Sequence, residues 1–229
     1  RDRKAKQSLE LATRLVVLQQ MALSELPKQL HAKTRVIYQS AEPFRAKSAS
    51  ASENFKVCVI GHLREEKDPL RTALAVRRLP AESRIEVTHI GVALNDHLGE
   101  KAQAEARRNP RYRWIGQLSH RKTRESLAQS DLACITSKME GSSNVLSEAL
   151  ACGVPVIATK IPGLVGTLGK NFLGYFPVGD THQLTKLLLK AETNADFYRL
   201  LKRQCARVAN LVQPEREFAH WKRLLQELA

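Results

Sequence analysis

The sequence predicts an α/β fold with a parallel sheet, because short apolar runs alternate with helical segments along most of the chain. One complete unit lies in the middle. Residues 132–135 form an apolar run typical of a buried strand. A polar loop with Gly141 follows, then a helical segment over residues 145–152 that Gly153 ends, and Pro155 opens a second apolar run. Strand, loop, helix and strand in this order make one parallel α/β unit.

The same alternation places the other elements. Strands are expected at residues 14–18, 34–38, 55–60, 84–90, 113–118 and 174–180, and helices at 1–12, 22–30, 70–79, 95–108, 119–129, 181–192, 195–211 and 214–228. Ser119 and Thr181 stand where N-cap residues are expected. Residues 160–169 contain three glycines and are predicted to form a mobile loop near a site.

Composition indicates a globular protein. Hydrophobic residues make up 43% of the 229 residues, which is enough for the core of one large domain or two small ones. No apolar run approaches the roughly 20 residues that a membrane-spanning helix needs. The cysteines lie too far apart for a zinc site or a disulfide framework, which is typical of reduced thiols in a cytoplasmic protein. They are Cys58, Cys134, Cys152 and Cys205.

A net charge of +14 calls for anionic partners, which could be nucleic acid, anionic lipid or phosphorylated small molecules. Aromatic residues are only 5% of the chain and form no alternating basic and aromatic platform on which bases could stack. The basic residues are spread over the chain, with a mild concentration over residues 101–124. Phosphorylated substrates, rather than nucleic acid, account for the sign of the charge, and general solvation of helix faces accounts for most of its magnitude.

The loop inside the central unit is suited to bind a phosphate. It supplies cap residues for the helix that follows, and its backbone N–H groups lie at the positive end of the helix dipole. The predicted anion-binding residues are Gly141, Ser142, Ser143, Asn144 and Val145.

Two carboxylates bracket this loop. Glu140 precedes it and Glu148 lies on the helix, with seven residues between them. Carboxylates repel phosphate but accept hydrogen bonds from hydroxyl groups. A ligand with phosphates in the middle and hydroxyls at both ends is a nucleotide sugar.

The two glutamates, followed by Ala-Leu-Ala-Cys-Gly-Val-Pro-Val-Ile-Ala at residues 149–158, resemble the signature of the retaining glycosyltransferases of family 4, which have the GT-B fold. The resemblance implies that Glu140 faces hydroxyls of the donor sugar near the reacting carbon, and that Glu148 holds the ribose hydroxyls. It also implies two Rossmann-like domains, of which the second binds the nucleotide sugar. The alternative is a plain α/β crossover with two solvated carboxylates.

A second loop of the predicted site follows the strand at residues 55–60. Gly61 ends that strand, and a glycine followed by cations in the next turn is a common phosphate-binding arrangement. The family usually has Gly-Arg-Leu, three residues, then Lys-Gly, and its Arg and Lys hold the donor diphosphate. Lys67 matches that lysine.

Two positions depart from the family pattern. His62 stands where the Arg is expected, and Asp68 stands where the second Gly is expected. Arg64 is the nearest replacement for the missing guanidinium. His62 could instead donate a proton to the leaving phosphate or to an acceptor, or be a packed histidine.

The strand and turn at residues 113–118 lie, in the resembling enzymes, beside the nucleotide base. Ile115 and Gln117 are the candidates for backbone contacts with the base. Trp114 is expected in the core rather than as a stacking platform.

The resemblance also implies a division into domains. Residues 1–40 are expected to be the remnant of a truncated N-terminal, acceptor-binding domain, and residues 55–212 to be the nucleotide-sugar-binding domain. Residues 41–54 form a linker by composition, or else a surface loop. Residues 213–229 are expected to form an amphipathic helix that crosses back to the N-terminal domain, with an apolar face that is exposed or used in a homodimer. The chain is thus interpreted as a fragment of a longer transferase.

Three stretches resemble, more closely, the selenosugar synthases of selenoneine biosynthesis. They are Gly-His-Leu-Arg-x-x-Lys-Asp-Pro at 61–69, Met-Glu-Gly-x-x-Asn-Val-x-Ser-Glu at 139–148 and Gly-Tyr-Phe-Pro-Val-Gly-Asp at 174–180. This resemblance implies UDP-N-acetylglucosamine as the donor and selenophosphate, a small anion, as the acceptor. Such a transfer needs neither a metal nor a cofactor beside the donor, because cationic groups stabilise the diphosphate.

Three other functions remain open. A family-4 enzyme could use a lipid-linked or other small-molecule acceptor. A GT-B epimerase would convert the donor without any acceptor. A basic nucleic-acid-binding domain would bind nucleic acid strands with a steep salt dependence.

Overall fold

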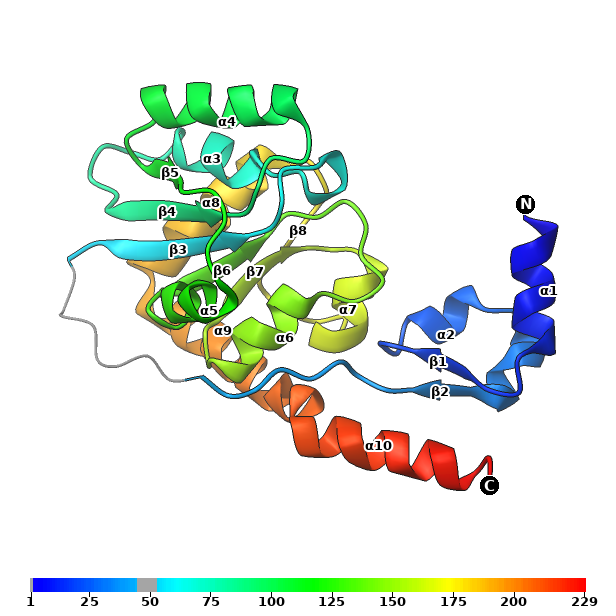
Figure 1. Ribbon diagram of the computed structural model, residues 1–229. Coiled ribbons are helices and arrows are strands. Elements are labelled where there is room, and N and C mark those ends of the chain that lie inside the picture. The colour runs from blue at the N-terminus through cyan, green and yellow to red at the C-terminus, as the bar shows by residue number, and fades with distance from the viewer. Residues whose placement is uncertain (1, 45–52) are drawn as a thin grey trace.

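A six-stranded, wholly parallel sheet forms the centre of the protein in the computed structural model, which describes residues 2–44 and 53–229 (Figure 1). Its strands are β3 (Phe55–Ile60), β4 (Ile85–Ile90), β5 (Tyr112–Trp114), β6 (Leu132–Ile135), β7 (Val156–Thr159) and β8 (Tyr175–Phe176). Their order across the sheet is β5-β4-β3-β6-β7-β8. The predicted parallel α/β sheet is confirmed. Most of the predicted linker lies outside the described residues.

Helices pack on both faces of this sheet. They are α3 (Arg71–Val76), α4 (Asp96–Arg108), α5 (His120–Ala128), α6 (Asn144–Ala151), α7 (Pro162–Leu168), α8 (Thr181–Thr193) and α9 (Ala195–Val208). Two short 3-10 helices accompany them, η2 (Glu65–Lys67) and η3 (Ala209–Val212). Helices α3 and α8 pack together on one face, and α9 contacts α6 and α7 on the other (Figure 1).

The strand order reverses at β3, which has β4 on one side and β6 on the other. In open α/β sheets, ligands bind outside the carboxyl ends of the strands at such a switch point, because the loops of the two neighbouring strands diverge there. The loops that follow β3 and β6 are the two loops in which the sequence places the site.

The core lies around the central strands. Every residue of β6 and of β7 is buried. Such strands lie between helices on both faces, so their sequences are continuous apolar runs rather than alternating ones. This is why both strands are recognisable in the sequence.

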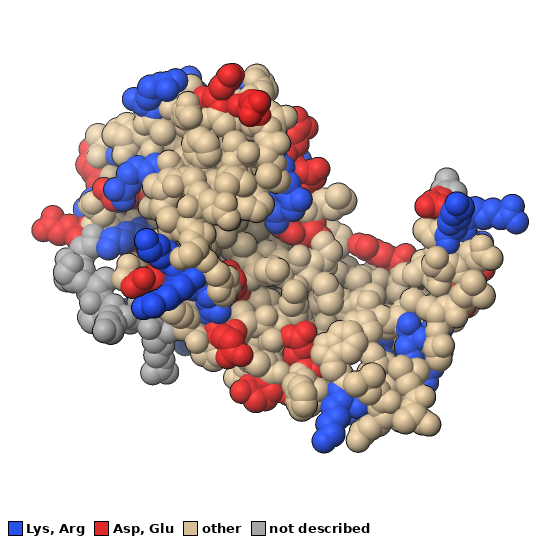
Figure 2. Space-filling view, viewed as in Figure 1, with Lys and Arg blue, Asp and Glu red and all other residues tan. Residues whose placement is uncertain are grey.

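The N-terminal residues form a separate, smaller layer. Its elements are α1 (Arg3–Leu11), β1 (Leu15–Val17), α2 (Ala22–Glu25), η1 (Lys28–Lys33) and β2 (Thr34–Val36). Strands β1 and β2 pair in parallel. The carboxyl ends of the large sheet face this layer (Figure 1), and Figure 2 shows a hollow between the two parts.

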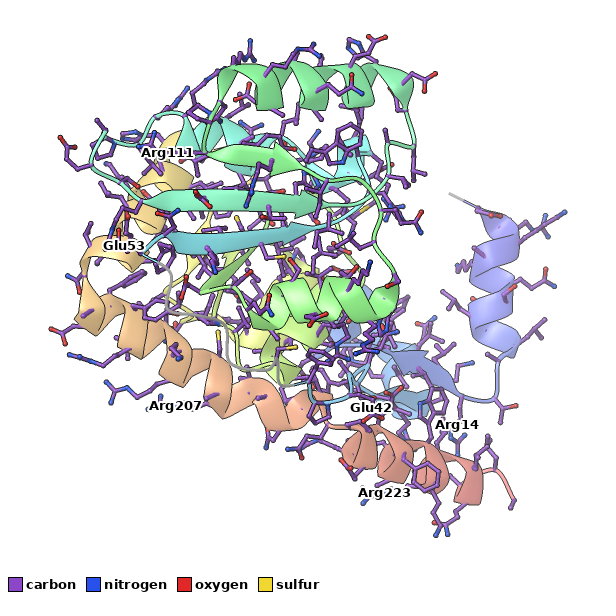
Figure 3. All side chains as sticks on the ribbon, turned by 60° about the vertical axis from the view of Figure 1, so that its left-hand side comes forward. Arg14, Glu42, Glu53, Arg111, Arg207 and Arg223 are labelled. Atoms are coloured by element: carbon purple, nitrogen blue, oxygen red, sulfur yellow. The ribbon has the colours of Figure 1, made fainter. Side chains whose placement is uncertain are left out.

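The last helix, α10 (Pro214–Gln226), runs along the N-terminal layer. The carboxylate of Glu227 accepts hydrogen bonds from Arg35 Nη2 at 2.6 Å and from Arg14 Nε at 3.5 Å. Figure 3 shows Arg14 and Arg223 on the same side of the molecule. Leu224 is buried, whereas Phe218 is 71% exposed. The division of the chain into domains stays a prediction.

The prediction of a mobile loop at residues 160–169 was wrong, because Pro162–Leu168 form α7. Pro162 takes the first helical position, where its fixed φ favours a helix. The glycines serve close packing. A Cβ on Gly163 would lie 2.0 Å from the carbonyl oxygen of Glu140, and one on Gly166 would lie 1.7 Å from Oε1 of Gln19.

Two smaller predictions were also wrong. Helix α8 is capped by Asp180, whose carboxylate accepts the N–H of Gln183 at 2.8 Å, so Thr181 is the first helical residue rather than the cap. The helix predicted at residues 22–30 is divided by Pro27 into α2 and η1, since proline cannot donate the hydrogen bond that a continuous helix needs. Ser119 caps α5 as predicted.

None of the helices within the described ranges combines the length and the apolar character required to cross a bilayer.

Candidate functional site

A pocket of about 300 Å³ lies beyond the carboxyl ends of β3 and β4, beside the switch point. Six predicted site residues line it: Gly61, His62, Arg64, Lys67, Gln117 and Val145. They come from three loops that are far apart in the sequence. The pocket therefore brings together the loop after β3, the turn after β5 and the start of α6.

A second, smaller cavity of about 10 Å³ adjoins the first and shares its Gly61, Lys67 and Val145. Glu140 and Ser143 also line it. The predicted carboxylate thus lies next to the predicted phosphate-binding loop, in the narrow part of the site.

Lys67 and Glu140 form an ion pair in this narrow part, with 2.5 Å between Nζ and Oε1. The hydroxyl of Ser137 donates a second hydrogen bond to the same Oε1, at 2.7 Å. The Glu140 side chain is only 9% exposed. Its other oxygen, Oε2, has no hydrogen-bond partner among the described residues, so it can accept a hydrogen bond from a ligand hydroxyl.

The loop that carries Lys67 is fixed through its backbone. The hydroxyl of Thr136 donates to the carbonyl oxygens of Lys67 at 2.8 Å and Asp68 at 3.0 Å. Asp68 has φ 45°, a left-handed conformation that costs most residues energy but is tolerated by Asp. Arg71 Nε donates to the Asp68 carboxylate at 2.8 Å. This accounts for an aspartate where the family has glycine.

His62 lies at the rim of the larger pocket with its side chain exposed. Its Nδ1 accepts the backbone N–H of Val92 at 3.2 Å, so the proton of the neutral ring lies on Nε2. Nε2 can donate a hydrogen bond without protonation of the ring, which suits an anionic ligand.

His89, on β4, supports the loop that follows β3, and it is a residue that was not predicted from the sequence. Its Nε2–H donates to the carbonyl oxygen of Gly61 at 3.0 Å, and its Nδ1 accepts the Tyr112 hydroxyl at 2.8 Å. Burial lowers the pKa of His89 to about 4, so the ring is neutral at pH 7. The sequence signal was only a histidine at a position of β4 that alternation would bury.

Gly91 explains how β4 and this loop come so close. Its φ is 153°, and a Cβ on it would lie 2.0 Å from the carbonyl oxygen of Gly61. Only glycine allows this approach. Trp114 Nε1 donates to the carbonyl of Gly91 at 2.8 Å, and the Trp114 ring packs against the core, as expected.

Glu148 lies on α6 and meets His120, with 3.2 Å between Oε1 and His120 Nε2. It lines neither of the two cavities, although its side chain is 17% exposed and open to a ligand. No sequence pattern pointed to His120, which is in the first turn of α5 and whose side chain is 76% exposed.

Four of the other predicted residues line neither cavity in the described part of the chain: Ile115, Gly141, Ser142 and Asn144. Ile115 is 44% exposed, and its backbone N–H donates to the carbonyl of His89 at 3.0 Å, so that group is not available to a base. Gly141, Ser142 and Asn144 lie in the loop before α6 and at its start. Ser143 caps α6 with its hydroxyl.

One of the residues that line the narrow cavity is a cysteine whose protonation state can be assigned. Cys134 is buried, and burial raises its pKa to about 12, so it is a neutral thiol rather than a nucleophile. No group of three or more His, Cys, Asp or Glu side chains in residues 2–44 and 53–229 could hold a metal ion. The chemistry available is cationic and hydrogen-bonding: two cations and a helix N-terminus for an anion, and a carboxylate for a hydroxyl.

Known proteins share this architecture. The chain is 45% identical over 76 residues to N-acetyl-α-D-glucosaminyl L-malate synthase of Bacillus anthracis, a match that covers 33% of this chain and 20% of that protein. It is similar in fold to Anabaena HepE in complex with UDP-glucose, with a TM-score of 0.79, 16% identity, and coverage of 97% of this chain and 65% of HepE. It is also similar to sucrose-phosphate synthase from Thermosynechococcus elongatus, with a TM-score of 0.81, 20% identity, and coverage of 100% and 62%. The chain thus spans less than two thirds of the length of each.

The family model of the glycosyl transferases group 1 matches residues 40–207, which include both loops of the site. That match covers well over half of the chain, and the fold agrees with it. The chain therefore belongs to the glycosyl transferases group 1 family, whose members have the GT-B fold.

Proposed function

We propose that this chain contains the donor site of a retaining family-4 glycosyltransferase that takes its sugar from UDP-N-acetylglucosamine and transfers it to selenophosphate in the cytoplasm. The observation that carries the proposal is the Lys67–Glu140 ion pair at the switch point of the sheet, between an open pocket and a phosphate-binding helix start. A cation and a carboxylate in contact suit a ligand that presents a phosphate beside a hydroxyl.

Two similar proteins support the identity of the donor. HepE was crystallised with UDP-glucose, and the name of the malate synthase specifies an N-acetyl-α-D-glucosaminyl product. The UDP bound to HepE supports a uridine nucleotide, and the name of the malate synthase, 45% identical over 76 residues, supports N-acetylglucosamine as the sugar. The α configuration in that name favours retention.

The proposed reaction breaks the bond between the anomeric carbon and the diphosphate, and UDP leaves with the electron pair. Negative charge then grows on the diphosphate, where Lys67, Arg64 and the start of α6 stabilise it. The first N–H groups of α6 lack intrahelical partners, as at the start of any helix, and the Ser143 hydroxyl accepts only that of Leu146. Glu140 holds sugar hydroxyls and lies near the cationic ring, while Glu148 holds the ribose.

Selenophosphate as the acceptor supplies the selenium that bonds to the anomeric carbon. Support comes from the resemblance of three stretches to selenosugar synthases, and from a net charge of +14 that suits two anionic substrates. The hollow between the large sheet and the N-terminal layer is where the acceptor would approach (Figure 2).

The donor is tested by calorimetric titration with UDP and with UDP-N-acetylglucosamine, for the unaltered chain and for Lys67→Ala and Glu148→Ala. We expect saturable binding of both ligands, weakened about tenfold or more by each substitution, since each removes one charge-assisted contact. Lys101→Ala, an exposed lysine on α4, is the matched control and should leave both affinities unchanged. Failure of the folded chain to bind either ligand would contradict the donor assignment.

The acceptor is tested by UDP release from UDP-N-acetylglucosamine in the presence of selenophosphate, phosphate or L-malate. Selenophosphate should be the acceptor that accelerates release. Acceleration by L-malate alone would indicate that the acceptor is an organic acid and not selenophosphate. Conversion of the donor without an acceptor would indicate an epimerase.

A further inference from the structure

Glu140 is held by two donors of different kinds. Lys67 Nζ and Ser137 Oγ both lie within hydrogen-bond distance of Oε1, at 2.5 and 2.7 Å. The lysine is a cation on a long flexible stem, whereas the serine is a neutral hydroxyl with a single side-chain torsion.

The two donors differ in what a bound diphosphate does to them. Lys67 also lines the open pocket, so an entering diphosphate competes with Glu140 for its ammonium group. Ser137 lines the narrow cavity but not the open pocket, and it is only 2% exposed. Its position is fixed from β7, because the hydroxyl of Thr159 donates to the Ser137 carbonyl at 2.6 Å. We therefore expect the serine to keep its position if the lysine turns toward a diphosphate.

The backbone of Glu140 is also fixed, because it packs against Gly163, where an added Cβ would lie 2.0 Å from the Glu140 carbonyl oxygen. The remaining freedom of Glu140 is in its side-chain torsions. A hydrogen bond to Oε1 determines those torsions and thereby the direction of Oε2.

We propose, building on the function above, that Ser137 is a positioning residue that keeps the Glu140 carboxylate aimed at the donor sugar while Lys67 holds the diphosphate. Ser137 acts on the donor sugar through Glu140 and contributes nothing to the binding of UDP itself, which lacks the transferred sugar that Glu140 would hold.

The neighbouring Thr136 provides a matched comparison. Its hydroxyl holds the backbone of Lys67 and Asp68, so it supports the diphosphate side of the same ion pair. Two adjacent hydroxyls at the end of β6 therefore support the two partners separately.

The test is calorimetric titration of Ser137→Ala and Thr136→Val with UDP and UDP-N-acetylglucosamine, together with the turnover of each variant. For Ser137→Ala we expect an unchanged Kd for UDP, a Kd for UDP-N-acetylglucosamine raised about tenfold, and reduced kcat, because a hydrogen bond to a charged group is lost. For Thr136→Val we expect both Kd values to rise by the same factor. Unchanged UDP binding by Ser137→Ala also shows that this variant is folded.

The outcomes separate this inference from the proposed function. If Ser137→Ala weakens the binding of UDP and of UDP-N-acetylglucosamine equally, or weakens neither, the positioning role is overturned while the donor site stands. If the unaltered chain binds neither ligand, the proposed function is overturned and the role of Ser137 with it.

Discussion

The two halves of the site are built differently. In the narrow half, the Glu140 carboxylate accepts hydrogen bonds from both Lys67 and Ser137, and the cavity holds about 10 Å³. In the open half, a pocket of about 300 Å³ is lined by His62 and Gln117, whose side chains are exposed. The narrow half therefore has its charges fixed before a ligand arrives, and the open half is shaped for a ligand that brings its own surface. Substitutions in the narrow half should therefore reduce turnover, ligand affinity or stability more than substitutions in the open half.

The largest effect is expected for Glu140→Gln, which keeps the shape of the side chain but removes its charge. Turnover should fall by about 100-fold or more, the size seen when a group that stabilises developing charge is removed. UDP should bind as tightly as before or more tightly, because Lys67 loses the carboxylate that competes for it. Glu65→Gln, an exposed glutamate in η2, is the control for an exposed charge in the same loop. Weaker UDP binding by Glu140→Gln would mean that the ion pair supports the phosphate site instead of competing with it.

The support beneath the narrow half should depend on pH through His89. Its pKa falls from 6.5 to about 4 on folding, so below pH 6.5 the unfolded chain takes up a proton that the folded chain does not. The contribution of this neutral ring to the free energy of unfolding is thus fully present above pH 6.5. It decreases by about 3 kcal/mol as the pH falls to 4.

Denaturant unfolding of the unaltered chain and of His89→Gln between pH 7 and pH 4 measures this term. The difference in unfolding free energy between the two should shrink as the pH falls, while the titration of carboxylates common to both cancels. A difference that stays constant with pH would show that His89 is not held neutral.

A smaller effect is expected for Gly163→Ala, where the new Cβ would meet the carbonyl oxygen of Glu140 at 2.0 Å. Overpacking against backbone should lower the free energy of unfolding by roughly 1–3 kcal/mol and displace Glu140. Gly141→Ala is the matched control for stability, because its Cβ would have no heavy atom within 4 Å. Equal stability of the two variants would show that α7 does not pack against the Glu140 loop as described.

The smallest effect is expected outside the two cavities, at the pair formed by His120 and Glu148. His120→Ala removes the exposed partner of Glu148, and exposed pairs contribute about 0–1 kcal/mol, so the Kd for UDP should change less than about fivefold. A larger change, measured in the same titration, would place His120 in contact with the nucleotide.

Sequence reasoning reached most of the fold because the central strands are continuous apolar runs. Strands β6 and β7, buried at every position, were predicted within a residue or two. The site loops were predicted from residues close together in the chain, such as the stretch from Glu140 to Glu148.

The features that could not be predicted from the sequence depend on contacts between distant segments. Gly163 needs its small size because of Glu140, and His89 is neutral because it lies under Gly61. Neither requirement leaves a local pattern, so α7 was predicted as a loop and His89 was missed. Ser137 lies two residues after the strand predicted at 132–135 and was not singled out, because its role depends on where its hydroxyl points.

The most direct test of the account is a crystal structure of this chain with UDP. We expect the uracil and ribose in the open pocket and the diphosphate within hydrogen-bond distance of Lys67 Nζ and the start of α6. The distance between Lys67 Nζ and Glu140 Oε1 should grow beyond 2.5 Å, while the Ser137 hydroxyl keeps its bond to Oε1. UDP bound elsewhere, or a diphosphate that leaves Lys67 on Glu140, would contradict it.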